Sequence, residues 1–169
     1  CFDLQSALNV ELNIEGNPFT EPQASDQPHV GDYPGFIALV QAIRPAQVTL
    51  VPDSDQQLTS DHGFNVADDG QRLEPLVKAF KDLGCRVSLF MDPEPGAMAT
   101  VASLGADRVE LYTESYARAH EAGDFEKTLT AFQETAEAAF AVGLGVNAGH
   151  DLNLSNLPDF AVPHLDEVS

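Results

Sequence analysis

The chain has 169 residues, of which 43% are hydrophobic, and this length and composition suit one domain with a sizeable core. Twenty-seven Asp and Glu residues against eight Lys and Arg give a formal charge of −19, which excludes a nucleic-acid-binding surface and disfavours an anionic membrane surface. No apolar run approaches the roughly 18 residues of a membrane-spanning helix. Two cysteines without a disulfide framework indicate a reducing cytoplasm.

Short stretches of β-type sequence recur along the chain. In the first, residues 8–14, apolar and polar side chains alternate, which is the periodicity of a strand. Further candidate strands lie at residues 47–51, 86–91, 108–113, 144–148 and 167–168. The sequence therefore predicts six strands.

Helical patterns separate these strands. They lie around residues 36–43, 73–80, 95–104 and 124–142. Pro45 ends the first, because proline disfavours the helical conformation in the residue before it, and Gly84 is placed to cap the second. Strict alternation of strand and helix predicts parallel strands joined by right-handed crossovers.

Two architectures fit this α/β pattern: an open doubly wound sheet, or an incomplete (β/α)₈ TIM barrel of about six β/α units. The barrel is favoured because polar residues occur at the C-terminal ends of several predicted strands, where barrel active sites are built. We expect residues 1–169 to form a single domain that is truncated at both ends. An acidic insertion at about residues 20–32 is expected to be mobile.

Two glutamates lie inside predicted strands. Glu11 lies between Val10 and Leu12, so its side chain points away from the face that those two residues share. Because an unpaired charge under helices is costly, we expect Glu11 at the mouth of the barrel, with a structural salt bridge as the alternative. Glu110 repeats the arrangement. Burial of two carboxylates in one cavity can raise a pKa into the range useful for proton transfer.

A histidine and a polar loop complete the candidate groups. His150 follows a predicted strand and Gly149, and imidazole is the side chain most easily tuned for acid–base chemistry near neutral pH. A structural histidine is the alternative, but the position at a strand end favours a functional one. The loop at residues 57–63 either binds a sugar-like substrate or satisfies its own turns.

No metal or nucleotide cofactor is predicted. The sequence has no HExxH, EF-hand or CxxC pattern. The Gly-Leu-Gly at residues 143–145 precedes a strand, whereas a dinucleotide-binding fingerprint follows one.

Six segments, taken together, resemble the pyridoxine 5′-phosphate synthase family in order, spacing and strand context. They are Asn9-Val10-Glu11-Leu12, Thr49–Pro52, Leu58–Gly63, Val87–Asp92, Val109–Thr113 and Gly145–Leu152. The resemblance implies a TIM barrel and a cofactor-independent transferase of vitamin B6 biosynthesis. Its reaction is the ring-closing condensation of 1-deoxy-D-xylulose 5-phosphate with 3-amino-2-oxopropyl phosphate, which releases phosphate and water.

The resemblance also implies roles for individual residues. Glu11 corresponds to the general base, His150 to the proton donor and Glu110 to the transition-state stabiliser. Thr59 matches a contact to the deoxyxylulose phosphate, and Asp151 a contact to the aminooxopropyl phosphate through its main-chain amide. A cytoplasmic homo-oligomer is expected. A further histidine and the phosphate-binding arginines of family members are absent from this sequence, so a non-catalytic barrel-derived binding module and another phosphosugar-handling barrel enzyme stay open.

Overall fold

The computed structural model describes residues 10–53 and 60–169, and its centre is a parallel sheet. The six strands are β1 (Asn13–Gly16), β2 (Gln47–Leu50), β3 (Arg86–Met91), β4 (Arg108–Tyr112), β5 (Gly145–Gly149) and β6 (Leu165–Val168). Each strand pairs in parallel with the next one in the chain, so that the order in the sheet is the order in the sequence. A doubly wound sheet would reverse its order at a switch point. The strand order therefore confirms the barrel class and excludes the doubly wound alternative.

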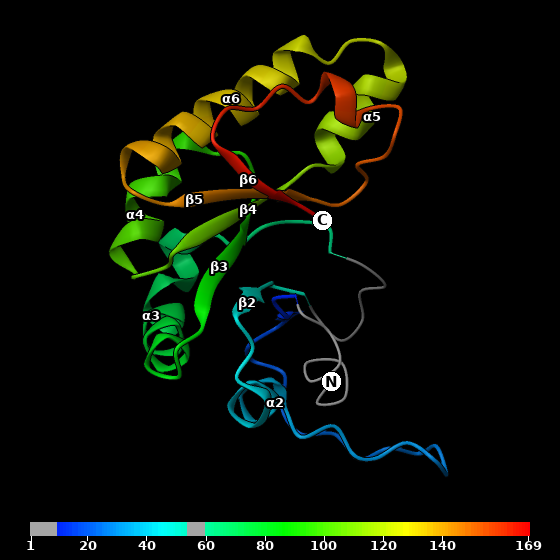
Figure 1. Cartoon of the computed structure of the whole chain (residues 1–169), viewed down its shortest axis with the longest axis vertical. Coiled ribbons are helices and arrows are strands. Elements are labelled where there is room, and N and C mark those ends of the chain that lie inside the picture. The colour runs from blue at the N-terminus through cyan, green and yellow to red at the C-terminus, as the bar shows by residue number, and fades with distance from the viewer. Residues whose placement is uncertain (1–9, 54–59) are drawn as a thin grey trace.

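Helices lie along the outer side of this sheet (Figure 1). They are α2 (Phe36–Ile43), α3 (Val66–Asp82), α4 (Met98–Ser103), α5 (Glu114–Ala122) and α6 (Glu126–Ala141), with short 3₁₀ turns at Pro95–Ala97 and Leu157–Asp159. Helix α3 begins earlier than its apolar pattern indicates, because the Asn65 side chain caps it by accepting the Ala67 N–H. Helix α5 was not predicted, since Tyr116 is its one buried residue and leaves no apolar stripe.

The first strand differs most from its prediction. The alternating pattern of residues 8–14 predicts a strand that includes Glu11, but β1 begins at Asn13. Asn13 pairs with Gln47, the first residue of β2, and the Leu12 carbonyl accepts a 3.1 Å hydrogen bond from the Gln47 N–H, so the pairing with β2 starts at this point of the chain. Residues 8 and 9 lie outside the described part of the chain.

The two faces of the sheet have opposite character. The outer face carries buried apolar side chains from every strand through β5, including Ile14, Val48, Leu89, Leu111 and Val146. Stripes of side chains from the helices pack against it, such as those containing Phe80 of α3 and Phe132 of α6. Burial of each such phenylalanine contributes about 1.5–3 kcal/mol.

The inner face is concave and mostly polar, although it also carries the aromatic side chains of Phe90 and Tyr112. Thr49 of β2 donates a hydrogen bond to Glu110 of β4 at 3.4 Å, and Gln47 of β2 donates one to Glu167 of β6 at 3.2 Å. In a flat sheet, strands four positions apart would be separated by roughly 19 Å. The sheet must therefore curl until β2 and β6 face each other, as in the wall of a barrel.

The acidic segment at about residues 20–32 extends away from the sheet (Figure 1). Gln23 and Tyr33 close its base through two antiparallel backbone hydrogen bonds of 2.9 and 2.8 Å. Its mobility stays a prediction. Among the described helices, none has the length and apolar character needed to cross a membrane.

Candidate active site

Three titratable side chains come together near the C-terminal edge of the curled sheet. Glu15 lies near the end of β1, Glu110 lies within β4, and His150 follows β5 directly. The imidazole Nε2 of His150 is 3.9 Å from Oε1 of Glu15, although the two residues come from strands that are not neighbours. This carboxylate and imidazole pair lies where (β/α)₈ barrels place their active sites.

Glu15 has a pKa suited to proton transfer. Burial raises the pKa of this carboxyl from 4.5 to about 7, and the negative charges of Glu110 and Asp53 add to the shift. The side chain is still 37% exposed, so solvent can reach it. A carboxyl group that titrates near neutral pH is available both to accept and to release a proton.

Glu110 is the buried member of the group, with 2% of its surface exposed. The hydroxyls of Ser169 and Thr49 donate hydrogen bonds to its two carboxylate oxygens, at 2.8 and 3.4 Å. Burial raises the pKa of Glu110, and these two bonds and the nearby His150 oppose the rise. Gly149 makes room for this arrangement, because a Cβ there would collide with the Glu110 carboxylate and the Ser169 hydroxyl.

His150 packs against two aromatic rings, which also contact each other. Its ring centroid is 5.0 Å from that of Phe90 and 5.4 Å from that of Tyr112, both in edge-to-face contact. His150 and Asp151 both have left-handed backbone conformations, with φ values of 73° and 57°. Both line a cavity of about 610 Å³, together with Tyr112 and with residues of α5 such as Arg118.

The structure corrects the placement of Glu11. Glu11 precedes β1, its side chain is 66% exposed, and its carboxylate accepts a 2.6 Å hydrogen bond from Arg86. Arg86 is the first residue of β3, so this ion pair lies at the N-terminal edge of the sheet, opposite to His150. The same contact lowers the pKa of Glu11. The prediction that Glu11 lies at the barrel mouth is wrong, and the salt-bridge alternative describes its position.

Sequence reasoning missed Glu15. Asn13-Ile14-Glu15 repeats the Asn-apolar-Glu pattern of residues 9–11, and that repeat is the signal that could have found Glu15. Asp53 follows β2, and its carboxylate accepts a 2.7 Å hydrogen bond from the Ser60 hydroxyl. It thereby joins the two ends of a loop whose middle, with Thr59, lies outside the described residues. The predicted contact of Thr59 is therefore untested.

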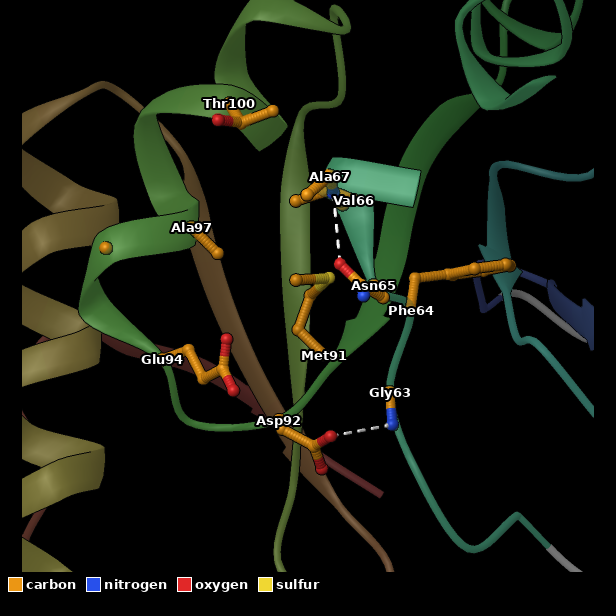
Figure 2. A pocket seen from close by; sticks show the side chains of 11 residues that line it. Gly63, Phe64, Asn65, Val66, Ala67, Met91, Asp92, Glu94, Ala97 and Thr100 are labelled. Carbon is orange, nitrogen blue, oxygen red and sulfur yellow. Dashed lines mark hydrogen bonds between the residues drawn. The ribbon is translucent and has the colours of Figure 1, made fainter. Parts of the chain in front are cut away.

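A second cavity, of about 370 Å³, lies between the N-terminus of α3 and the segment that follows β3 (Figure 2). Asn65 faces it while capping α3, and the Asp92 carboxylate accepts a 3.2 Å hydrogen bond from the Gly63 N–H. Gly63 must be glycine, because a Cβ would collide with the backbone of Asp92. No cluster of three or more metal-ligating side chains occurs in the part of the chain that the structure describes.

A curled parallel β/α sheet with an acid–base group at the C-terminal ends of its strands defines part of a TIM-barrel domain with an enzyme-like site. The chain belongs to the family described as pyridoxal phosphate biosynthesis protein PdxJ, which it matches over residues 1–169.

Curated relatives agree with this family. The chain is 56% identical over 162 residues to the pyridoxine 5′-phosphate synthase of Xanthomonas campestris pv. campestris (strain B100), covering 95% of this chain and 60% of that protein. It is 53% identical over 168 residues to the enzyme of the same name from Xylella fastidiosa (strain M12), covering 98% of this chain and 62% of that protein. The chain thus spans about three fifths of the length of these relatives.

Among solved structures, a citrate lyase from Burkholderia xenovorans LB400 superimposes with a TM-score of 0.44 at 15% identity. The match covers 92% of this chain and 52% of that one. This likeness is too slight to inform the function.

Proposed function

We propose that the chain is the larger part of a pyridoxine 5′-phosphate synthase, a cofactor-independent transferase. It would condense 1-deoxy-D-xylulose 5-phosphate with 3-amino-2-oxopropyl phosphate and form pyridoxine 5′-phosphate, phosphate and water. The observation that carries the proposal is the Glu15 and His150 pair beside buried Glu110, in a chain of the PdxJ family. Ring closure with loss of water and phosphate needs repeated proton transfers, and this group is suited to them.

Each of the three side chains takes a distinct role in this proposal. Glu15 is the general base, in the place expected for Glu11, because its pKa of about 7 leaves a large ionised fraction at neutral pH. His150 is the proton donor, and its distance of 3.9 Å from Glu15 allows the two groups to act on one bound substrate. Glu110 stabilises the transition state from its buried position, where electrostatic interactions are strong.

The phosphorylated substrates would be held by the chain on either side of these residues. We assign the aminooxopropyl phosphate to the main-chain amide of Asp151, because the carboxylate of that residue would repel a phosphate. The cavity shared by His150 and Asp151 supports this assignment. Thr59 remains the proposed contact to the deoxyxylulose phosphate.

Two conservative variants test the catalytic assignment: Glu15→Gln and, as its matched control, Glu11→Gln. Formation of pyridoxine 5′-phosphate from the two substrates is measured by chromatography. Removing a general base is expected to lower kcat by about 10²–10⁴-fold, so Glu15→Gln should lose nearly all activity. Glu11→Gln removes only an exposed ion pair and should retain activity. Equal activity of the two variants, or no product from the unaltered chain, would refute the proposal for this chain.

Self-association and a cytoplasmic location belong to the same proposal. Within the described residues, β1 and β6 each pair with a strand on one side only, which leaves two sheet edges to be covered. Cys85 is free and buried, as suits a reducing compartment. Sedimentation equilibrium would measure the association, and a monomer at all concentrations would refute it.

A further inference from the structure

The turn that presents His150 has an unusual backbone. His150 and the next residue, Asp151, both have positive φ values, 73° and 57°. Neither is glycine, and the left-handed region is disfavoured for residues with a Cβ. Such a conformation persists only where the surrounding structure holds it in place. The turn therefore needs partners outside itself.

Thr113 provides the first of these partners. It directly follows β4, it is fully buried, and its hydroxyl donates a 2.7 Å hydrogen bond to the Gly149 carbonyl. The same hydroxyl also contacts the carbonyl oxygen of His150. The Thr113 backbone N–H adds a 3.1 Å hydrogen bond to the Gly149 carbonyl. One buried residue just after β4 thus contacts both the Gly149 and the His150 carbonyls at the start of the turn.

Asn156 provides the second partner from the other side. Its side-chain amide donates a 3.0 Å hydrogen bond to the Asp151 carbonyl, and its amide oxygen accepts the Asn153 N–H at 2.8 Å. Asn156 is itself fixed, because the hydroxyl of buried Tyr116 donates a 2.7 Å hydrogen bond to its carbonyl. The carbonyls of residues 149, 150 and 151 are therefore all contacted from outside the turn.

We propose that Thr113 and Asn156 are positioning residues that fix the left-handed turn and so set the imidazole of His150 against Glu15. With both in place, the ring packs against Phe90 and Tyr112 and lies 3.9 Å from the Glu15 carboxylate. Both residues are buried and act on the backbone carbonyls of the turn. The expected effect on catalysis rests on the role proposed for His150. The expected effect on the position of the imidazole ring does not depend on that role.

The test compares Thr113→Val, which removes the hydroxyl and keeps the shape, with Thr113→Ser, which keeps the hydroxyl. Proton NMR of this chain would follow nuclear Overhauser effects between the His150 ring and the rings of Phe90 and Tyr112. Thr113→Val should lose these effects while the rest of the spectrum shows a folded chain, and Thr113→Ser should keep them. In the synthase assay, kcat of Thr113→Val should fall by about 10–100-fold with little change in KM, and Thr113→Ser should restore it.

A folded Thr113→Val chain with unchanged ring contacts would overturn the inference. If that variant does not fold, Asn156→Asp replaces it, because this isosteric change puts an oxygen in place of the donor to the Asp151 carbonyl. The same loss of ring contacts is then expected, and their retention would overturn the inference. An unaltered chain that makes no product would refute the proposed function and leave the NMR comparison to decide the role of Thr113.

Discussion

Replacing Glu15 by glutamine should stabilise the fold at neutral and alkaline pH, even though it removes a proposed catalytic group. Burial and the nearby charges of Glu110 and Asp53 raise the pKa of Glu15 from 4.5 to about 7 in the folded chain. Between these two pH values the folded chain binds more protons than the unfolded chain. By linkage, the free energy of unfolding then falls as the pH rises through this range. Glutamine cannot ionise, so Glu15→Gln removes that fall.

The size of the effect follows from the pKa and the exposure. At 1.36 kcal/mol per pKa unit, a change from 4.5 to about 7 corresponds to about 3.4 kcal/mol. The side chain is 37% exposed, and solvent screens part of this energy. We therefore expect Glu15→Gln to be more stable than the unaltered chain by about 1–2 kcal/mol at pH 8, with a Tm higher by roughly 2–8 °C. At pH 4 the two should be nearly equal.

Glu11→Gln is the control variant, because the pKa shift of Glu11 has the opposite sign to that of Glu15. Its contact with Arg86 lowers the pKa of Glu11, so the carboxylate stabilises the fold above its ordinary pKa and this contribution is lost as the pH falls. Glu11→Gln should therefore never be more stable than the unaltered chain. Thermal unfolding followed by circular dichroism between pH 4 and pH 8 measures all three proteins. The quantity to compare is the free energy of unfolding of Glu15→Gln minus that of the unaltered chain. If this difference were smaller at pH 8 than at pH 4, the electrostatic reasoning would be refuted.

Two further variants test the surroundings of the site. Gly149→Ala should lower the free energy of unfolding by about 1–3 kcal/mol, because its Cβ pushes on the buried Glu110 carboxylate. Gly96→Ala is the control and should be neutral, because there is open space around its Cβ. Urea unfolding of the two variants measures the difference. Asp53→Asn should move the acid limb of the pH–rate profile to lower pH, because the Asp53 charge helps to raise the pKa of Glu15. Asp92→Asn, in the second cavity, should leave that limb in place, and an unmoved limb in Asp53→Asn would contradict the assignment of Glu15.

Most strands of the sheet could be predicted, because side-chain alternation and apolar content both indicated the same residue ranges. The prediction for β3, residues 86–91, coincides with the observed strand, and β2 and β4 end within one residue of their predictions. Helix α5 could not be found in this way. It has one buried side chain, Tyr116, and its position depends on contacts with Phe132 and Phe160 that are distant in sequence.

The candidate site was predicted in part, for a physical reason that Glu11 and Glu15 make clear. Side chains alternate between the two faces of an extended chain, so residues separated by an even number share a face. Glu11 does share the inner face, since it bonds to Arg86, which also bonds to Gln47 on that face. Alternation therefore gave the correct face but could not give the depth along the barrel axis.

Depth is set by strand register, which depends on partners from other parts of the chain. Asn13 pairs with Gln47, and this pairing puts Glu15 beside Thr49 and near the edge that His150 occupies. Four residues along an extended chain correspond to about 13 Å, which separates the Glu11–Arg86 ion pair at one end of the sheet from the proposed general base near the other. Because the Asn-apolar-Glu pattern occurs at both positions, the local sequence could not choose between them. Only the pairing of β1 with β2 decides which glutamate meets the histidine.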